Sequence, residues 1–281
     1  MSASLLRALA TGAAAFFMLG PLVSHAQSAL GVEYEMRDTE SSHGSADQRP
    51  STYHVQVLNG QSRIAASAGG DALLVSADGR TMTVLRPDKQ TYTTMSTDKF
   101  ENIIGNVLSM VKDATKILQL ELRQALITPQ HMGSGGTMLG YPTEQSRLTY
   151  DYTMRVGAMG FTTDTKQRVV VDYWTTTGVD LPHNPLVELL ATANSALAQA
   201  DADFRTKSRA AQTALVRGTI LRVRSTSYDM DEDSKNKRDK SPDMHMVEIT
   251  SVAKANLRRD AFVIPSTYRL DKDAFSVHLG K

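Results

Sequence analysis

Short alternating segments separated by turn residues dominate residues 53–95. The turn signals recur at roughly ten-residue spacing, which is typical of an antiparallel β-meander rather than of helices. Asn-Gly and Asp-Gly pairs tolerate the positive φ that two-residue hairpin turns require. The sequence therefore predicts consecutive hairpins, with turns at Asn59-Gly60, Gly69-Gly70-Asp71, Asp78-Gly79 and Pro87-Asp88.

Alternation of apolar and polar residues also predicts strands outside this meander. The clearest is 147–156, where Leu148, Tyr150, Tyr152 and Met154 share one face, so that one side is buried and the other is wet. The other predicted strands are 30–37, 161–174, 218–228 and 244–254, with a flexible loop at 128–136.

Two longer segments show helical spacing instead. Residues 98–128 carry one wide apolar face, and at about 1.5–3 kcal/mol for each large side chain buried this face cannot stay in water. It either packs permanently on the sheet or forms a lid that shares its apolar face with a ligand. Residues 184–217 begin with Asn184-Pro185, a good helix start, and carry a narrow alanine-rich stripe typical of a covering helix.

The first 26 residues have the features of a secretory signal peptide. Arg7 supplies the positive charge, an apolar stretch follows, and Ser24-His25-Ala26 provides a small-x-small cleavage site. We therefore expect cleavage after Ala26, a soluble periplasmic protein without a transmembrane segment, and a single domain over 27–281. Polar loops are predicted near 38–50 and 229–243.

Composition excludes several classes of chemistry. The chain has no cysteine, which removes disulfides, thiolate metal sites, cysteine nucleophiles and a lipidated N-terminus. Its formal net charge is +1, so it lacks the basic excess of a nucleic-acid-binding protein. The histidines are scattered, and Met132 stands where a serine-nucleophile elbow around Ser134 needs glycine. We expect no cofactor, no metal and no catalytic residue; a hydrolase of envelope material is the remaining enzyme alternative.

Several motifs resemble a known family. Leu74-Val75-Ser76, Asp78 to Met82 and Leu85 to Asp88, with Arg63 before them, resemble a hairpin of the periplasmic lipoprotein-carrier (LolA-like) family. Gly140-Tyr141-Pro142, the strand ending in Trp174 and residues 262–268 are more similar to a related group of secreted bacterial domains. This resemblance implies a terminal strand at 262–268. The resemblance implies a curved antiparallel half-barrel whose apolar concave face is closed by helices and holds acyl chains.

These features together predict an α+β protein, a curved antiparallel sheet with two long helices packed on or covering its concave face. The predicted function is non-catalytic binding or carriage of a lipid or acylated peptide between sheet and helices. The alternative is an envelope structural or interaction protein with a packed core and no ligand. Arg63 is expected at the cavity mouth, and the expected cavity lining is Ile103, Val107, Val111, Leu118, Tyr150, Tyr152, Met154 and Trp174.

Overall fold

The computed structural model describes residues 28–41, 50–97, 99, 118–158, 161–182, 184, 187, 201–230 and 242–272. The expected signal peptide at 1–26, residues 100–117 of the first predicted helix and most of both polar loops lie outside these residues. Within the described ranges, no helix has the length and apolar character needed to cross a membrane.

Twelve strands form one sheet. Strands that are neighbours in this sheet are also consecutive in the sequence, with two exceptions, the pairs β1–β11 and β12–β6. The spatial order is β12-β6-β5-β4-β3-β2-β1-β11-β10-β9-β8-β7. Only β12 and β6 pair in parallel. The bounds are β1 Ser28–Ser41, β2 Ser51–Leu58, β3 Gln61–Ala66, β4 Ala72–Val75, β5 Thr81–Arg86, β6 Thr91–Ser96, β7 Leu118–Met138, β8 Tyr141–Ala158, β9 Phe161–Thr176, β10 Thr219–Asp229, β11 Asp243–Arg258 and β12 Arg269–Leu270.

The predicted meander over 53–95 is confirmed as β2 to β6. Asn59 and Gly60 form the two-residue turn between β2 and β3 with φ of 51° and 80°, as this kind of hairpin turn requires. Gly79, also at positive φ, lies in the turn between β4 and β5, where the Asp78 carboxylate accepts a hydrogen bond from the Arg80 backbone at 3.0 Å.

The expected α+β fold with two long helices is wrong. Strands make up 67% of the described residues, and in this part of the chain the α-helix with defined bounds is α4 (Ala202–Leu215). Residues 118–128 of the first predicted helix belong to β7, because Leu118, Leu120 and Leu122 also alternate with polar residues and the segment pairs with β8.

The second predicted helix, 184–217, is interrupted at Asp201. This residue is the N-cap of α4, and its side chain accepts a hydrogen bond from the Phe204 backbone at 2.9 Å. An N-cap has extended backbone, so one continuous helix does not run over 184–217; residues 185–186 and 188–200 of this prediction lie outside the described residues.

Three shorter predictions also need correction. The predicted loop at 128–136 is part of β7, since bulges absorb its glycines and the strand stays paired with β8. The predicted strand at 262–268 is instead the end of a 3-10 turn, η2 (Arg259–Phe262), followed by irregular chain before β12. Asp38 to Ser41 extend β1 instead of opening the polar loop, because they pair with β11.

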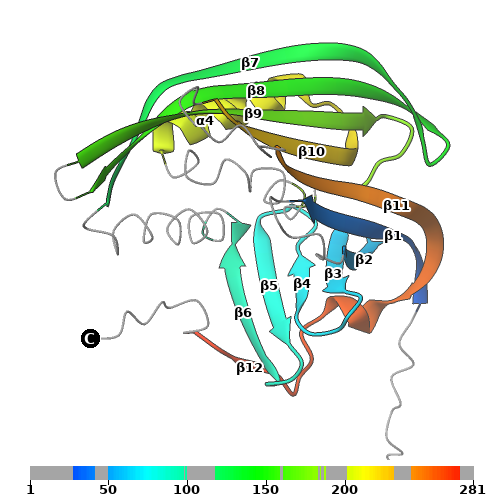
Figure 1. Ribbon diagram of the computed structural model, residues 1–281. Helices are drawn as coiled ribbons and strands as arrows, with labels where there is room; N and C mark the ends of the chain where they lie inside the picture. Colours follow the sequence, from blue (N-terminus) through cyan, green and yellow to red (C-terminus); the bar gives the residue numbers. More distant parts are fainter. Residues whose placement is uncertain are drawn as a thin grey trace, which may run out of the picture.

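The sheet is bent, and its apolar face lies on the inside of the bend. Figure 1 shows β7 to β10 in one layer with α4 along it, β2 to β6 in another, and β1 and β11 curving between the two. One buried cluster joins Leu73 and Met82 from the meander to Leu181, which follows β9, and Tyr141, the first residue of β8, packs against this cluster. Residues so distant in the sheet order can share a cluster only if the sheet curls toward this side. We call this side the concave face and the opposite side the convex face.

Candidate functional site

Helix α4 is fixed to β8 by an aromatic cluster on the concave face. Phe204 is buried, and its ring centroid lies 5.6 Å from that of Tyr150 and 6.0 Å from that of Tyr152. Such tilted and edge-on arrangements are the favoured geometries for aromatic pairs. Ser208, one turn further along, donates a hydrogen bond to the Tyr150 hydroxyl at 3.0 Å. The helix is therefore held in a defined position above β8.

A groove of about 630 Å³ lies between α4 and the edge strand β7. A bulge in β7 between Arg123 and Leu126 helps to shape it, and Leu126 is 59% exposed. Lys207 and Asp203 form an ion pair of 2.7 Å on the helix side. The lining is Leu122, Ala125, Leu126, Ile127, Pro129, Asp201, Asp203, Phe204, Lys207 and Ala211. This volume falls within the range of small-molecule sites, and most of the lining is apolar.

Three of the predicted lining residues come together beneath this groove. Tyr150, Tyr152 and Met154 belong to one buried cluster with Phe204. In the β7–β8 register, Ile127 pairs with Tyr150 and Leu122 with Met154, so the groove lining borders these residues directly. Burial raises the pKa of Tyr152 from 10.0 to about 12.

The other predicted site residues are not gathered there. Trp174 lies on the convex face, because Tyr173, its neighbour in β9, belongs to the concave cluster and side chains alternate along a strand. Arg63 is on the convex side for the same reason, since Ile64 is in the concave core. Leu118 is the first residue of β7. Ile103, Val107 and Val111 lie outside the described residues.

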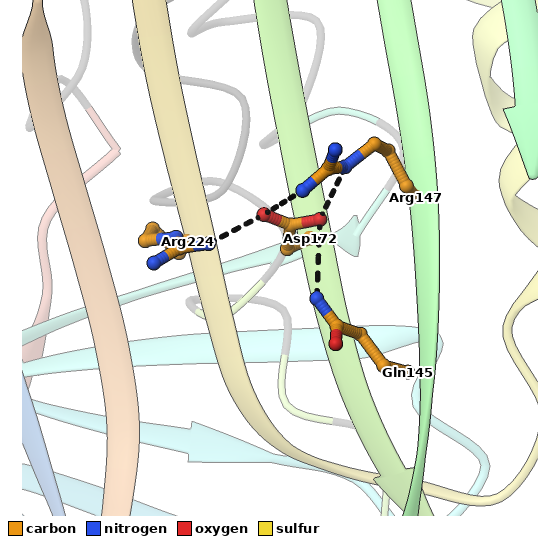
Figure 2. A network of polar contacts seen from close by, with 4 residues as sticks. All are labelled: Gln145, Arg147, Asp172 and Arg224. Atoms are coloured by element: carbon orange, nitrogen blue, oxygen red, sulfur yellow. Dashed lines mark hydrogen bonds and ion pairs between the residues drawn. The ribbon is translucent and has the colours of Figure 1, made fainter. Parts of the chain in front are cut away.

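The convex face of β8 to β10 carries a polar network centred on Asp172, shown in Figure 2. Arg147 donates two hydrogen bonds to this carboxylate, at 2.7 and 3.1 Å, and Arg224 donates one at 2.8 Å. Gln145 adds a long contact of 3.5 Å. Burial by itself would raise the pKa of Asp172, but the hydrogen bonds and positive charges of the two arginines hold it below its usual value.

Two arginines of β10, Arg222 and Arg224, lie over the one tryptophan of the chain, Trp174. The guanidinium carbons of Arg222 and Arg224 lie 5.5 and 5.3 Å from the Trp174 ring centroid, within cation-π range. Glu248 accepts two hydrogen bonds from Arg222, at 3.1 and 2.8 Å. A side chain at Gly135 would collide with the Trp174 ring edge, which shows how closely the β7 backbone covers it.

Two other polar features lie on the concave side. His245 Nε2 and Asp38 Oδ1 are 2.5 Å apart and tie β11 to β1. A second cavity of about 240 Å³ includes Tyr34 and Asn184, whose amide donates to the Tyr34 hydroxyl at 3.2 Å. Burial raises the pKa of Tyr34 to about 12. Among the described residues, no group of three or more acidic or histidine side chains could hold a metal ion.

Sequence reasoning missed the role of β7 in the site. The signal was present, because 118–123 alternates strictly between leucine and a polar residue, a pattern of period two. Phe204 appeared in the sequence only as one member of a weak helical stripe. Its role as the anchor of α4 depends on contacts with Tyr150 and Tyr152, which lie about fifty residues earlier in the chain and come close only in the fold.

Comparison with known proteins does not assign the chain to a family. No protein-family model matches the chain, and no curated protein matches it.

Proposed function

We propose that this protein binds an apolar ligand, a lipid or an acyl group, without catalysis, in the groove between α4 and β7. The observation that carries the proposal is the groove itself, about 630 Å³, in which seven of the ten lining residues are apolar. Burying acyl methylenes contributes about 0.8 kcal/mol for each group. An acyl chain along these seven residues would therefore gain free energy from each methylene that it buries there.

The groove also has a firm support and a polar margin. Its base is the cluster of Phe204, Tyr150 and Tyr152, so the ligand would lie against side chains that are already fixed. Asp203 and Lys207 lie on its helix side, where the head group of an amphiphile could meet charge. Preorganised walls lower the entropic cost of binding.

The resemblance to lipoprotein carriers and the signal-like N-terminus support the same proposal. On this basis the chain acts in the periplasm after removal of residues 1–26, and its ligand is a lipid or an acylated peptide. The carrier role follows from the motif resemblance in the 74–88 hairpin, which the β4–β5 pair contains.

One observation favours the alternative, an envelope interaction protein without a ligand. The concave face is already filled by protein: Leu148, Val169 and Tyr150 are at most 1% exposed. In this alternative the groove is a shallow margin of a packed core, and partners bind elsewhere.

A substitution in the groove separates the two functions. Ala125→Asp places a charge on the groove wall at an exposed position in the β7 bulge, opposite the concave Tyr152, so folding should be little affected. Ala253→Asp is the matched control, because Ala253 is also an exposed strand alanine but lies on β11. Binding of a fluorescent fatty acid should weaken about tenfold in Ala125→Asp, since an acyl chain in the groove would desolvate the new carboxylate at a cost of about 1.4 kcal/mol, and stay unchanged in Ala253→Asp. Equal binding by both variants and the unsubstituted protein would remove the groove from the proposal.

A further inference from the structure

The convex face carries a group of arginines whose arrangement differs from that of ordinary surface ion pairs. Asp172 is only 2% exposed, yet it points to the outer side of the sheet. It is covered by Arg147 and Arg224, whose side chains are 31% and 38% exposed. The carboxylate is therefore the inner layer and the guanidiniums are the outer layer.

Arg224 is the centre of this group. It shares the Asp172 carboxylate with Arg147 and the Trp174 ring with Arg222. The three guanidiniums, which come from β8 and β10, thus lie around Asp172 and Trp174 of the intervening strand β9. Against them stand two carboxylates, those of Asp172 and Glu248, which leaves one positive charge in excess.

Each of these arginines also has N–H donors that no contact within the described ranges uses. Arg147 uses Nε and Nη2 for Asp172, Arg222 uses Nε and Nη2 for Glu248, and Arg224 uses Nη2 for Asp172. No contact within the described ranges engages Nη1 of any of the three. The Nε of Arg224 is buried and has no hydrogen-bond partner among these residues.

We propose that Arg147, Arg222 and Arg224 form a binding site for an oxyanion, the phosphate group of a small molecule or of a lipid head group. Guanidinium donors match phosphate oxygens in geometry and charge. Asp172, Glu248 and Trp174 fix the three side chains before the ligand arrives, which reduces the entropy lost on binding. The site is on the convex face and is independent of the apolar groove.

The single tryptophan provides a reporter for this site. Trp174 contacts two of the three arginines, so its fluorescence should respond when an anion binds. The full chain is titrated at low salt with inorganic pyrophosphate, and separately with vesicles of phosphatidylglycerol, with phosphatidylcholine vesicles as the neutral comparison. Isothermal titration calorimetry repeats each titration independently of the fluorescence baseline. A response to pyrophosphate indicates a free phosphate compound as the ligand, and a response to phosphatidylglycerol alone indicates a lipid head group.

Matched variants decide whether the response belongs to the proposed site. Arg224→Gln should weaken binding at least tenfold, while Arg168→Gln should change it less than twofold. Arg168 is on the same face, pairs with Asp151 at 2.6 Å, and its loss removes the same charge. Arg222→Gln leaves Asp172 with both its arginines and should also weaken binding several-fold, which covers the case in which Arg224→Gln fails to fold. No response to either probe, or equal weakening by Arg168→Gln and Arg224→Gln, would overturn the proposal.

Discussion

Replacing Asp172 with asparagine should destabilise the protein more than any comparable change on the convex face. The substitution keeps the size of the side chain but removes the charge that Arg147 and Arg224 share. The asparagine amide group also places N–H donors against guanidinium donors. Removing one partner of a fully buried ion pair costs about 3–5 kcal/mol, because a charge remains buried and unpaired.

The cost is smaller here because both arginines reach solvent. At 31% and 38% exposure, their guanidiniums can recover part of their hydration and are screened by salt. We therefore expect a loss of about 2 kcal/mol in the free energy of unfolding, which corresponds to a fall of about 4–8 °C in the melting temperature for a chain of this size.

Urea denaturation at pH 7, followed by far-UV circular dichroism, measures this loss directly. Asp164→Asn is the control, because Asp164 pairs with Arg155 at 2.6 Å on the same face but is 42% exposed; it should leave the free energy of unfolding nearly unchanged. Since the pKa of Asp172 is lowered in the folded state, its contribution is present above the ordinary value of 3.8 and is lost as pH falls through the folded pKa. The difference between Asp172→Asn and the unsubstituted protein should therefore shrink in that acidic range. An equal, small effect of both substitutions at pH 7 would refute the reasoning.

Two further predictions concern the concave face and one turn. The pKa of Tyr34 is raised from 10.0 to about 12, so the contribution of its hydroxyl to the free energy of unfolding is intact below pH 10 and is lost between pH 10 and 12, a change of about 2–3 kcal/mol. The free energy of unfolding, measured at pH 8 and at pH 11, should therefore fall less in Tyr34→Phe than in the unsubstituted protein. Tyr228→Phe, at an exposed position, should behave like the unsubstituted protein. Gly218→Ala should cost at least about 2 kcal/mol more than Gly79→Ala in urea denaturation. Both glycines have positive φ, but a Cβ at Gly218 would overlap the Thr176 carbonyl oxygen while one at Gly79 meets nothing within 4 Å. Equal costs would show that the backbone near Gly218 yields without strain.

The strands with strict alternation could be predicted from sequence, because burial of one face requires apolar and polar residues to alternate with a period of two. Tyr150, Tyr152 and Met154 were recognised in this way, and they do lie together at the base of the groove. Asn59 and Gly60 were recognised because their backbone angles are rare for other residues.

The prediction of two long helices was wrong, and the reason is physical. In 118–128, the leucines satisfy both a helical and an alternating pattern, and pairing with β8 decided between them. The resemblance to lipoprotein carriers implies that Trp174 is part of the cavity wall, whereas its large ring by itself indicates structural packing. It is indeed buried, but on the convex face, where Arg222, Arg224 and the β7 backbone cover it. Cross-strand contacts of this kind depend on register, which sequence alone does not supply.

The most direct test of the proposed function is native mass spectrometry of the protein purified from the periplasm without detergent, combined with organic extraction and lipid analysis. The proposal predicts a stoichiometric additional mass that extracts as a lipid or acyl compound and is reduced in Ala125→Asp. A mass equal to the protein alone, unchanged after incubation with acyl lipids, would contradict apolar ligand binding and favour the interaction protein.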